Sequence, residues 1–406
     1  MSKYLTIFDT EAAYNAASEN LDKPNVSYIK ETEDVMYLPM TVYENEYLTL
    51  NIISAGTITW KASSTSSSAS KTISYSLDNG QSWTDLTSIS YGVSISVGAG
   101  DKVLLKGNND QYSTLTYNNT FAGSTAYFDV EGNIMSLVNA DNFATATTFA
   151  SGTDNNFKFL FAGTNVINAE NLILPVQTMT DYCYEFMFLN CPLLEAAPAI
   201  KATTASASGC CGMFSGCTSL EKAPALPATT LDRGSYYQMF KGCTGLTAAP
   251  ELPATTLAES CYNRMFAECA SLTTAPELPA TTLANYCYSY MFADCINLTT
   301  APELPATTLA NYCYSYMFYG CIGLTSAPQL PAATLTQNAY NAMFAFDSQL
   351  SQITCLATNI SATNCTKNWL EGVSENGTFT KDASMTGWTT GVDGIPTNWA
   401  VVDYSA

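Results

Sequence analysis

The stretch LANYCYSYMFADCINLTTAPELPATTLANYCYSYMF, residues 283–318, decides the fold because it contains the same motif twice. The pair Met-Phe recurs seven times in the chain, always 26 residues apart. A unit of this length cannot bury its apolar residues alone and must stack on copies of itself. The sequence therefore predicts a solenoid whose Met-Phe pairs begin at Met187, Met213, Met239, Met265, Met291, Met317 and Met343.

The order of residues within one repeat predicts a coil with a helical side and an extended side. Cys287, Met291 and Cys295 lie four residues apart in CYSYMFADC. This is the spacing of one face of a short helix, so we expect them to point inward. The following LTTAPELPATTL contains two prolines, which do not fit a helix interior and remove backbone donors. We therefore expect a parallel stack of α/β-type coils that rise ~4.8 Å each.

The repeat is regular over about 181–350 and less regular on both sides. A degenerate opening coil is predicted at about 157–175, so we place the solenoid at 136–352. An open solenoid end exposes its core, and residues 353–406 are therefore expected to form a C-terminal cap. Three tryptophans in that segment are interpreted as its hydrophobic contacts, with a ligand platform as the alternative: Trp369, Trp388 and Trp399.

The chain before the solenoid has a different pattern. Over residues 43–135, short runs of β-type sequence alternate with Gly, Asn, Asp and Ser, which predicts an all-β sandwich. Residues 1–42 are more acidic and less regular, and we expect a docking or adaptor segment there. Within the sandwich, Ser76–Trp83 (SLDNGQSW) fits the Asp-box hairpin, in which Gly80 adopts a positive φ and Asp78 bonds the turn amides. A structural hairpin is favoured there over a glycan contact.

Charge and composition exclude several functions. The 406 residues include 35 acidic and 15 basic ones, and the net charge of −20 repels phosphate backbones, which argues against nucleic acid as a partner. No run approaches the ~18 apolar residues of a membrane span. The start of the chain has neither a Sec signal nor a lipid-attachment cysteine, so we expect no membrane insertion and synthesis in a cytosol. Histidine is absent, which removes the commonest general base and most zinc sites, so we expect neither an enzyme nor a cofactor.

The cysteines follow the repeat and not a pairing scheme. Of 14 cysteines, twelve lie between Cys183 and Cys321 at positions locked to the coil. Cytosolic synthesis favours free thiols, and we expect these side chains to be small buried core residues. A zinc site formed by sulfur alone is disfavoured, since Cys287 and Cys295 are eight residues apart and zinc knuckles use two to four.

One row of acidic residues also follows the repeat. Glu251, Glu277 and Glu303 occupy the same position in successive coils. Like charges in a row are unfavourable unless solvent or a cation separates them. A solvated face is the favoured interpretation, weak Ca²⁺ binding by these three residues is the alternative, and no other metal site is expected.

Tyrosines are the best candidates for a binding surface. Several alternate with Cys and Ser in two neighbouring repeats, so half are expected in the core and the rest at the surface. Tyrosine is favoured at interfaces because it joins a rigid ring to a polar tip. The candidate contact residues are Tyr286, Tyr288, Tyr290, Tyr312, Tyr314 and Tyr316.

The unit CYxxMFxGCxxLxxAPxLP resembles the BspA-like leucine-rich repeats of Bacteroidetes surface proteins over about 200 residues. This resemblance implies a curved, parallel-stranded solenoid used for adhesion to protein or glycan. Exported members of that family carry a signal peptide, which the start of this chain lacks.

The flanking segments resemble modules of virion proteins from phages of Bacteroidales, including crAss-like phages. The matching stretches are KPNVSYIKETEDVMYLP, YSLDNGQSW, DKVLLKGNN, FDVEGNIMSL, GTFTKDASMTGW and GIPTNWAV. Phage particles assemble in the host cytoplasm, which agrees with the missing signal. The resemblance implies a structural virion protein, a component of a head fibre or tail fibre, that adheres to a host surface protein or to gut glycans. It would dock on other virion proteins through its N-terminal segment, and both a homo-oligomer and a monomer stay open.

Two alternatives stay open. A bacterial cell-surface adhesin of the BspA type would need an export signal upstream. A glycan hydrolase would use the β region as its catalytic module and a pair of carboxylates as its acid and base.

Overall fold

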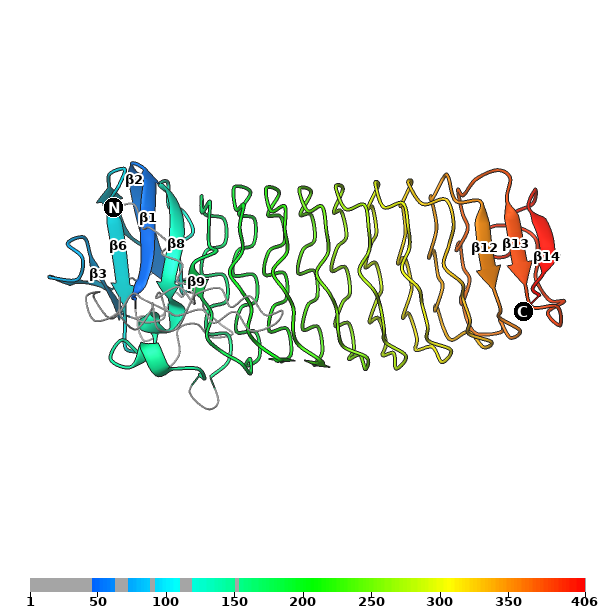
Figure 1. The fold of residues 1–406 in the computed structure, drawn as a ribbon, viewed down its shortest axis with the longest axis horizontal. Coiled ribbons are helices and arrows are strands. Elements are labelled where there is room, and N and C mark those ends of the chain that lie inside the picture. The colour runs from blue at the N-terminus through cyan, green and yellow to red at the C-terminus, as the bar shows by residue number, and fades with distance from the viewer. Residues whose placement is uncertain (1–45, 63–71, 88–91, 110–118, 150–152, 406) are drawn as a thin grey trace, which may run out of the picture.

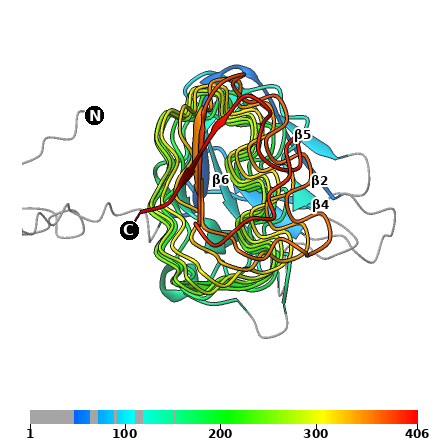
Figure 2. The same cartoon turned by 90° about the vertical axis from the view of Figure 1, so that its right-hand side faces the viewer.

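The computed structural model describes residues 46–62, 72–87, 92–109, 119–149 and 153–405. The predicted docking segment, residues 1–42, lies outside these ranges. The described chain forms a rod, with a sheet region at one end and stacked coils along the rest (Figure 1). Viewed along the rod, the coils superimpose on one another (Figure 2).

The sheet region consists of two sheets whose strands alternate buried and exposed residues. In KVLLK, for example, Val103 and Leu105 are buried while their neighbours face outward. The strand pairs within this region are antiparallel except for the parallel pair of β8 and β9. The larger sheet has the order β4 (Thr84–Thr87), β3 (Thr72–Ser76), β6 (Lys102–Lys106), β1 (Leu48–Ser54), β8 (Tyr127–Asn133) and β9 (Leu172–Ile173). The smaller sheet has the order β5 (Val93–Val97), β2 (Gly56–Ala62) and β7 (Asn119–Thr120).

The solenoid grows directly from the larger sheet. Strand β9 belongs to the opening coil and pairs in parallel with β8, where the Val130 N–H donates to the Asn168 carbonyl at 2.8 Å. Two short 3-10 helices follow β8, namely η4 (Ile134–Leu137) and η5 (Phe143–Thr145). One hydrophobic core includes residues of both the sheets and the coils, so the first coil is closed by a sheet and not by solvent.

The coils stack in parallel, as the sequence predicts. Their extended sides pair only briefly, in β10 (Thr204–Ala205), β11 (Thr230–Leu231) and single bridges such as Thr256 to Thr282. Prolines explain the short pairing because each one removes a backbone donor from the ladder. The result is a β-solenoid of about 26-residue coils.

Identical side chains lie on top of one another inside the rod. All seven methionines of the Met-Phe pairs are 0 % exposed, and so are the leucines seven residues after each of them. The phenylalanines form one stack from Phe161 to Phe344, in which neighbouring ring centroids lie 5.3–5.7 Å apart. The prediction that the Met-Phe pairs face the core is confirmed.

The predicted helical side of the coil is wrong. No α-helix occurs in the described part of the chain, and the segment around each Met-Phe pair is a ribbon of tight turns. Amide donors alternate along it: the Met291 N–H donates within its own coil to Tyr288, and the Phe292 N–H donates to Met317 of the next coil. Every fourth residue has a positive φ, for example Tyr286, Tyr290 and Asp294 at 59°, 55° and 60°.

This ribbon explains why the inward positions were predicted correctly while the element was not. A four-residue period places Cys287, Met291 and Cys295 on the inner side, as a helix would. A helix, however, would bond every N–H within its own segment. Here half of these donors hold neighbouring coils together.

The coil geometry continues beyond residue 352, the predicted end of the solenoid. The Phe344 N–H donates to the Trp369 carbonyl at 3.0 Å, and Trp369 is buried 26 residues after Met343. Its ring stacks on Trp388 with centroids 5.4 Å apart. The last strands pair in parallel in the order β12 (Gln352–Cys355), β13 (Thr378–Lys381) and β14 (Ala400–Asp403). A capping role for residues 353–406 stays a prediction.

Candidate binding groove on the solenoid

The six predicted contact tyrosines divide into two groups. Tyr288 and Tyr314 are only 1 % and 2 % exposed and belong to the core stack of the coils. The other four are half-buried at the surface: Tyr286, Tyr290, Tyr312 and Tyr316. The backbone conformation distinguishes the two groups. All four surface tyrosines have φ between 55° and 59°, and this conformation turns their side chains out of the ribbon.

The surface tyrosines form two short ladders along the rod. Tyr286 stacks on Tyr312 and Tyr290 stacks on Tyr316, each with ring centroids 4.4 Å apart. Partial burial raises the pKa of Tyr286, and the neighbouring Tyr312 raises it further. Burial and the nearby Tyr316 act in the same way on the pKa of Tyr290. The hydroxyls of Tyr286 and Tyr290 therefore stay neutral at physiological pH.

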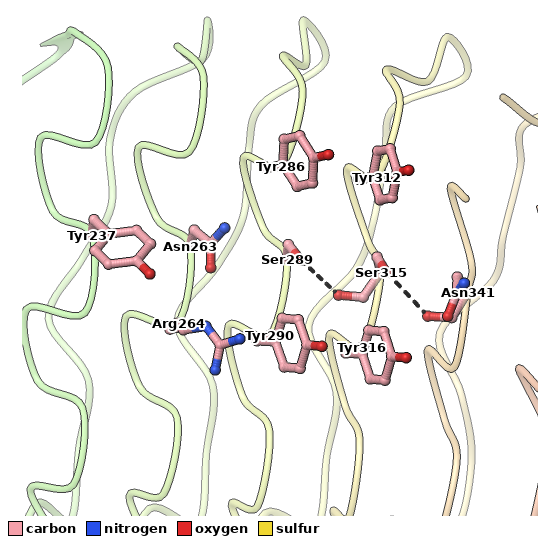
Figure 3. A pocket seen from close by; sticks show the side chains of 10 residues that line it. All are labelled: Tyr237, Asn263, Arg264, Tyr286, Ser289, Tyr290, Tyr312, Ser315, Tyr316 and Asn341. Atoms are coloured by element: carbon pink, nitrogen blue, oxygen red, sulfur yellow. Dashed lines mark hydrogen bonds between the residues drawn. The ribbon is translucent and has the colours of Figure 1, made fainter. Parts of the chain in front are cut away.

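A row of polar side chains lies between the ladders and forms the floor of a groove of about 370 Å³ (Figure 3). Its members are 26 residues apart: Tyr237, Asn263, Ser289, Ser315 and Asn341. The Ser289 hydroxyl donates to the Ser315 carbonyl at 3.0 Å, and the Ser315 hydroxyl donates to the Asn341 carbonyl at 3.4 Å. The two serines are thereby fixed to the backbone, which makes the floor rigid.

Asn263 differs from the serines of this floor. Its side chain is 9 % exposed, and its buried Oδ1 has no hydrogen-bond partner. Figure 3 shows the amide at the groove, between the levels of Tyr286 and Arg264. The oxygen is enclosed in this arrangement, so a donor in the groove meets it only when the Asn263 side chain turns outward.

Arg264 extends one of the tyrosine ladders by one coil. Its guanidinium carbon lies 4.0 Å from the Tyr290 ring centroid, which is a cation–π contact. In the described part of the chain Arg264 forms no ion pair with a carboxylate, since Glu259 pairs with Arg233 and Glu268 pairs with Lys241. Its planar donors are therefore available at the groove.

Neither the floor of the groove nor Arg264 was predicted from the sequence. The signal was present, because Asn263 and Ser289 are one repeat apart, as are Arg264 and Tyr290. Comparing the residues at equivalent repeat positions beside the tyrosines identifies the floor residues and Arg264. The residues involved are Asn, Ser and Arg, and these types do not by themselves indicate a binding site.

The acidic row lies at the surface of the coils. Glu251, Glu277 and Glu303 are all exposed, and Glu277 and Glu303 border a depression of about 260 Å³ that is lined mainly by prolines. Among the residues that the structure describes, no group of three or more His, Cys, Asp or Glu side chains could hold a metal ion. The weak Ca²⁺ alternative gains no support from this geometry.

The cysteines are free and buried, as expected. None of the 14 forms a disulfide. In every regular coil except the last, one thiol donates to the phenylalanine carbonyl of the preceding coil, for example Cys243 to Phe214 at 3.1 Å. Burial raises the pKa of the Cys243 thiol to about 12, so it is protonated and poorly nucleophilic at neutral pH.

The Asp-box motif forms the expected hairpin between β3 and β4. Gly80 has a φ of 83°, and the Asp78 carboxylate accepts from the Ser82 N–H at 2.9 Å. Hydrogen bonds from the Ser82 and Ser76 hydroxyls lower the pKa of Asp78 to about 2. The carboxylate is therefore committed to holding the turn.

No protein-family model, curated protein or solved structure matches this chain. In the described ranges, no helix has the length and apolar character that a membrane crossing needs.

Proposed function

We propose that this chain is a structural, non-enzymatic virion protein of a phage that infects Bacteroidales. It serves as a component of a head fibre or tail fibre, and its solenoid attaches the particle to the bacterial surface. In this proposal the coils are of the BspA-like leucine-rich-repeat type, the sheet region is a β-sandwich, residues 1–42 dock on other virion proteins, and residues 353–406 cap the rod.

The observation that carries the proposal is the groove between the tyrosine ladders. It lies on the outside of the rod, in coils far along the chain from the sheet region. A fibre needs a rigid shaft with a recognition surface away from its attachment point, and repeat arrays supply both. The family resemblance of the repeats and of the flanking modules supports the same function.

Localisation on purified particles tests this proposal. Virions of a phage that encodes the chain are analysed by mass spectrometry, and gold-labelled antibodies raised against residues 181–350 are imaged on intact particles. We expect peptides of the chain in the virions and gold at a head fibre or tail fibre. Peptides confined to the host envelope would instead identify a bacterial adhesin.

A second assay addresses the enzyme alternative. The purified chain is incubated with host polysaccharide, and released reducing ends are measured. We expect no release above a heat-inactivated sample. Sustained release would contradict the non-enzymatic assignment and favour a glycan hydrolase.

A further inference from the structure

We propose that the groove between the two tyrosine ladders binds an uncharged oligosaccharide. This inference rests on the proposed function, since it names the ligand class of the surface that would attach the particle. Four features of the groove carry it: an unmet buried acceptor, a free aromatic face, its size and its charge.

The first feature is the unpartnered Oδ1 of Asn263. A buried acceptor without a donor costs about 1–3 kcal/mol. If the Asn263 side chain turns to meet a ligand hydroxyl, the hydrogen bond removes that cost in the bound state. Sugars carry several hydroxyls, and Ser289 and Ser315 line the groove beside Asn263.

The second feature is an open ring face at one end of the Tyr286 ladder. Tyr286 stacks on Tyr312 on one side, whereas the preceding coil has Ser260 at the same position. Among the described residues, no other aromatic ring contacts Tyr286. The C–H face of a pyranose ring fits such a surface while its hydroxyls point to Asn263 and Arg264.

The third feature is size. The floor from Asn263 to Asn341 spans three coil rises of ~4.8 Å, or about 14 Å. The volume of about 370 Å³ lies in the usual range for small ligands. A stable protein partner needs about 800 Å² on each side with an apolar centre. None of the exposed large hydrophobic residues, such as Ile296 and Ile322, lines the groove.

The fourth feature is charge. The whole chain carries −20, and Glu259 lies close enough to Tyr286 to raise the pKa of its hydroxyl. This field repels an anionic polymer. Arg264 is the one cation that lines the groove, and its ring stacking on Tyr290 fixes its donors for the neutral oxygens of a sugar.

The tyrosines are not required by the fold. Neighbouring coils carry Ser260 and Asn338 at the position of Tyr286 and Tyr312. At the position of Tyr290 and Tyr316, Gln238 stands two coils before Tyr290 and Ala342 stands in the coil after Tyr316. The same turn ribbon forms with these residues, so a structural requirement does not explain the aromatic rings.

Calorimetric titration of the full chain tests the site. The probes are maltohexaose, cellohexaose, mannohexaose and xylohexaose, with hexagalacturonate as the acidic comparison. We expect at least one neutral hexaose to bind and hexagalacturonate to bind more weakly. The absence of binding by all four neutral probes overturns the proposal, and so does tighter, salt-sensitive binding of hexagalacturonate.

Matched variants locate the site. The double variant Tyr286→Ser, Tyr312→Asn takes its residues from neighbouring coils, and we expect it to fold normally and to bind at least tenfold more weakly. Asn263→Leu removes the unmet acceptor, so its melting temperature should be equal or higher while binding falls at least tenfold. The control Tyr182→Ser changes an outward tyrosine at the same coil position outside the groove, and its affinity should equal that of the parent. Unchanged binding in both groove variants overturns the assignment.

Binding to host cells separates a glycan from a protein. Fluorescently labelled chain is added to Bacteroidales cells pretreated with periodate or with protease. We expect periodate to abolish binding and protease to leave it. Binding that survives periodate and is abolished by protease overturns the proposal of a glycan ligand. These assays use the isolated chain, so their outcome is independent of the virion proposal. If the chain binds a hexaose but is absent from virions, only the virion proposal is refuted. If the chain is present in virions but binds no hexaose, only the groove proposal is refuted.

Discussion

In six of the seven regular coils, a cysteine thiol donates a hydrogen bond to the coil before it. Sγ of Cys217, Cys243, Cys269 and Cys295 donates to a phenylalanine carbonyl 29 residues earlier, at 3.1 Å in every case. A thiol fits this place because it is small, apolar and still a weak donor. The chemistry of the cysteines in this rod is therefore packing, and their number reflects the number of coils.

The thiols should react very slowly with a thiol reagent in the folded protein, and all of them should react after unfolding. Burial raises their pKa values, so the native chain should react with a thiol reagent far more slowly than a free cysteine. In denaturant without reductant we expect all 14 to react. A lower count in denaturant would show disulfides, and fast native labelling would show that the coils do not bury them.

Asp347 replaces this cysteine in the last regular coil. It is fully buried, its Oδ1 accepts from the Cys321 N–H at 2.7 Å, and its Oδ2 has no partner. Burial raises the pKa of this carboxyl well above its usual range. The carboxyl therefore keeps its proton to a higher pH in the folded chain than in the unfolded chain.

This aspartate should make the rod less stable as the pH rises. A folded-state pKa above the unfolded value means that the contribution of Asp347 is fully present below the unfolded pKa and is lost as pH rises through the folded pKa. Asp347→Asn keeps the acceptor for Cys321 and cannot ionise. We expect its gain in unfolding free energy over the parent to be larger at pH 8 than at pH 4, by about 1–3 kcal/mol.

Thermal unfolding at the two pH values measures the effect. Asp382 is the control, because the Ser384 hydroxyl lowers the pKa of this exposed carboxyl. Asp382→Asn should show no gain that grows with pH. An Asp347→Asn gain that is equal at pH 4 and pH 8 would show that the buried carboxyl does not titrate as described.

The turn ribbon is the element that sequence patterns described least well. Its four-residue period was visible, and the inward residues followed from it. The positive φ angles were hidden because the residues that adopt them are mostly not glycine, as at Tyr290 and Asp294. The clue lay across the repeats, where Gly216, Gly242 and Gly320 occupy the position of Asp294. A single repeat resembles a helix, and only the alignment of repeats shows a position that favours glycine.

Glycine at this position should stabilise the ribbon. Asp294 has a φ of 60°, and its pKa is raised by burial and then by repulsion from Glu268. Asp294→Gly relieves the positive-φ strain and removes the half-buried carboxylate, and it should raise the free energy of unfolding by about 0.5–1 kcal/mol. Gly320→Ala is the reverse change, because a Cβ there would lie 2.5 Å from the Asp294 carboxylate at a φ of 72°. It should lower stability by about 1 kcal/mol or more.

Chemical denaturation of the two variants beside the parent measures both effects. Opposite signs are expected. A loss of stability in Asp294→Gly would show that the carboxylate holds the turn in a way that the ribbon geometry does not account for.

The rod as a whole was predictable because its repeat is regular, while its two ends and its groove were not. The seven Met-Phe pairs fixed the coil length and the core. The join at β8 and β9 was missed, because a sheet that continues into a coil leaves no periodic signal. The continuation past residue 352 was missed because Trp369 stands where Met is expected. Four tyrosines of the groove were predicted from the sequence. Its floor became visible only when the structure placed equivalent residues of successive coils side by side.

Deleting chain segments of two lengths tests the stacked-coil account most directly. Removal of residues 206–231 takes out one complete 26-residue repeat and joins Ala205 to Asp232, which keeps every row in register. Removal of residues 206–218 takes out half a repeat and places core residues opposite surface positions. The two variants are compared by thermal unfolding and small-angle X-ray scattering. The account predicts that the first unfolds cooperatively with a rod shorter by ~5 Å, and that the second loses its cooperative transition. Equal behaviour of the two deletions would contradict it.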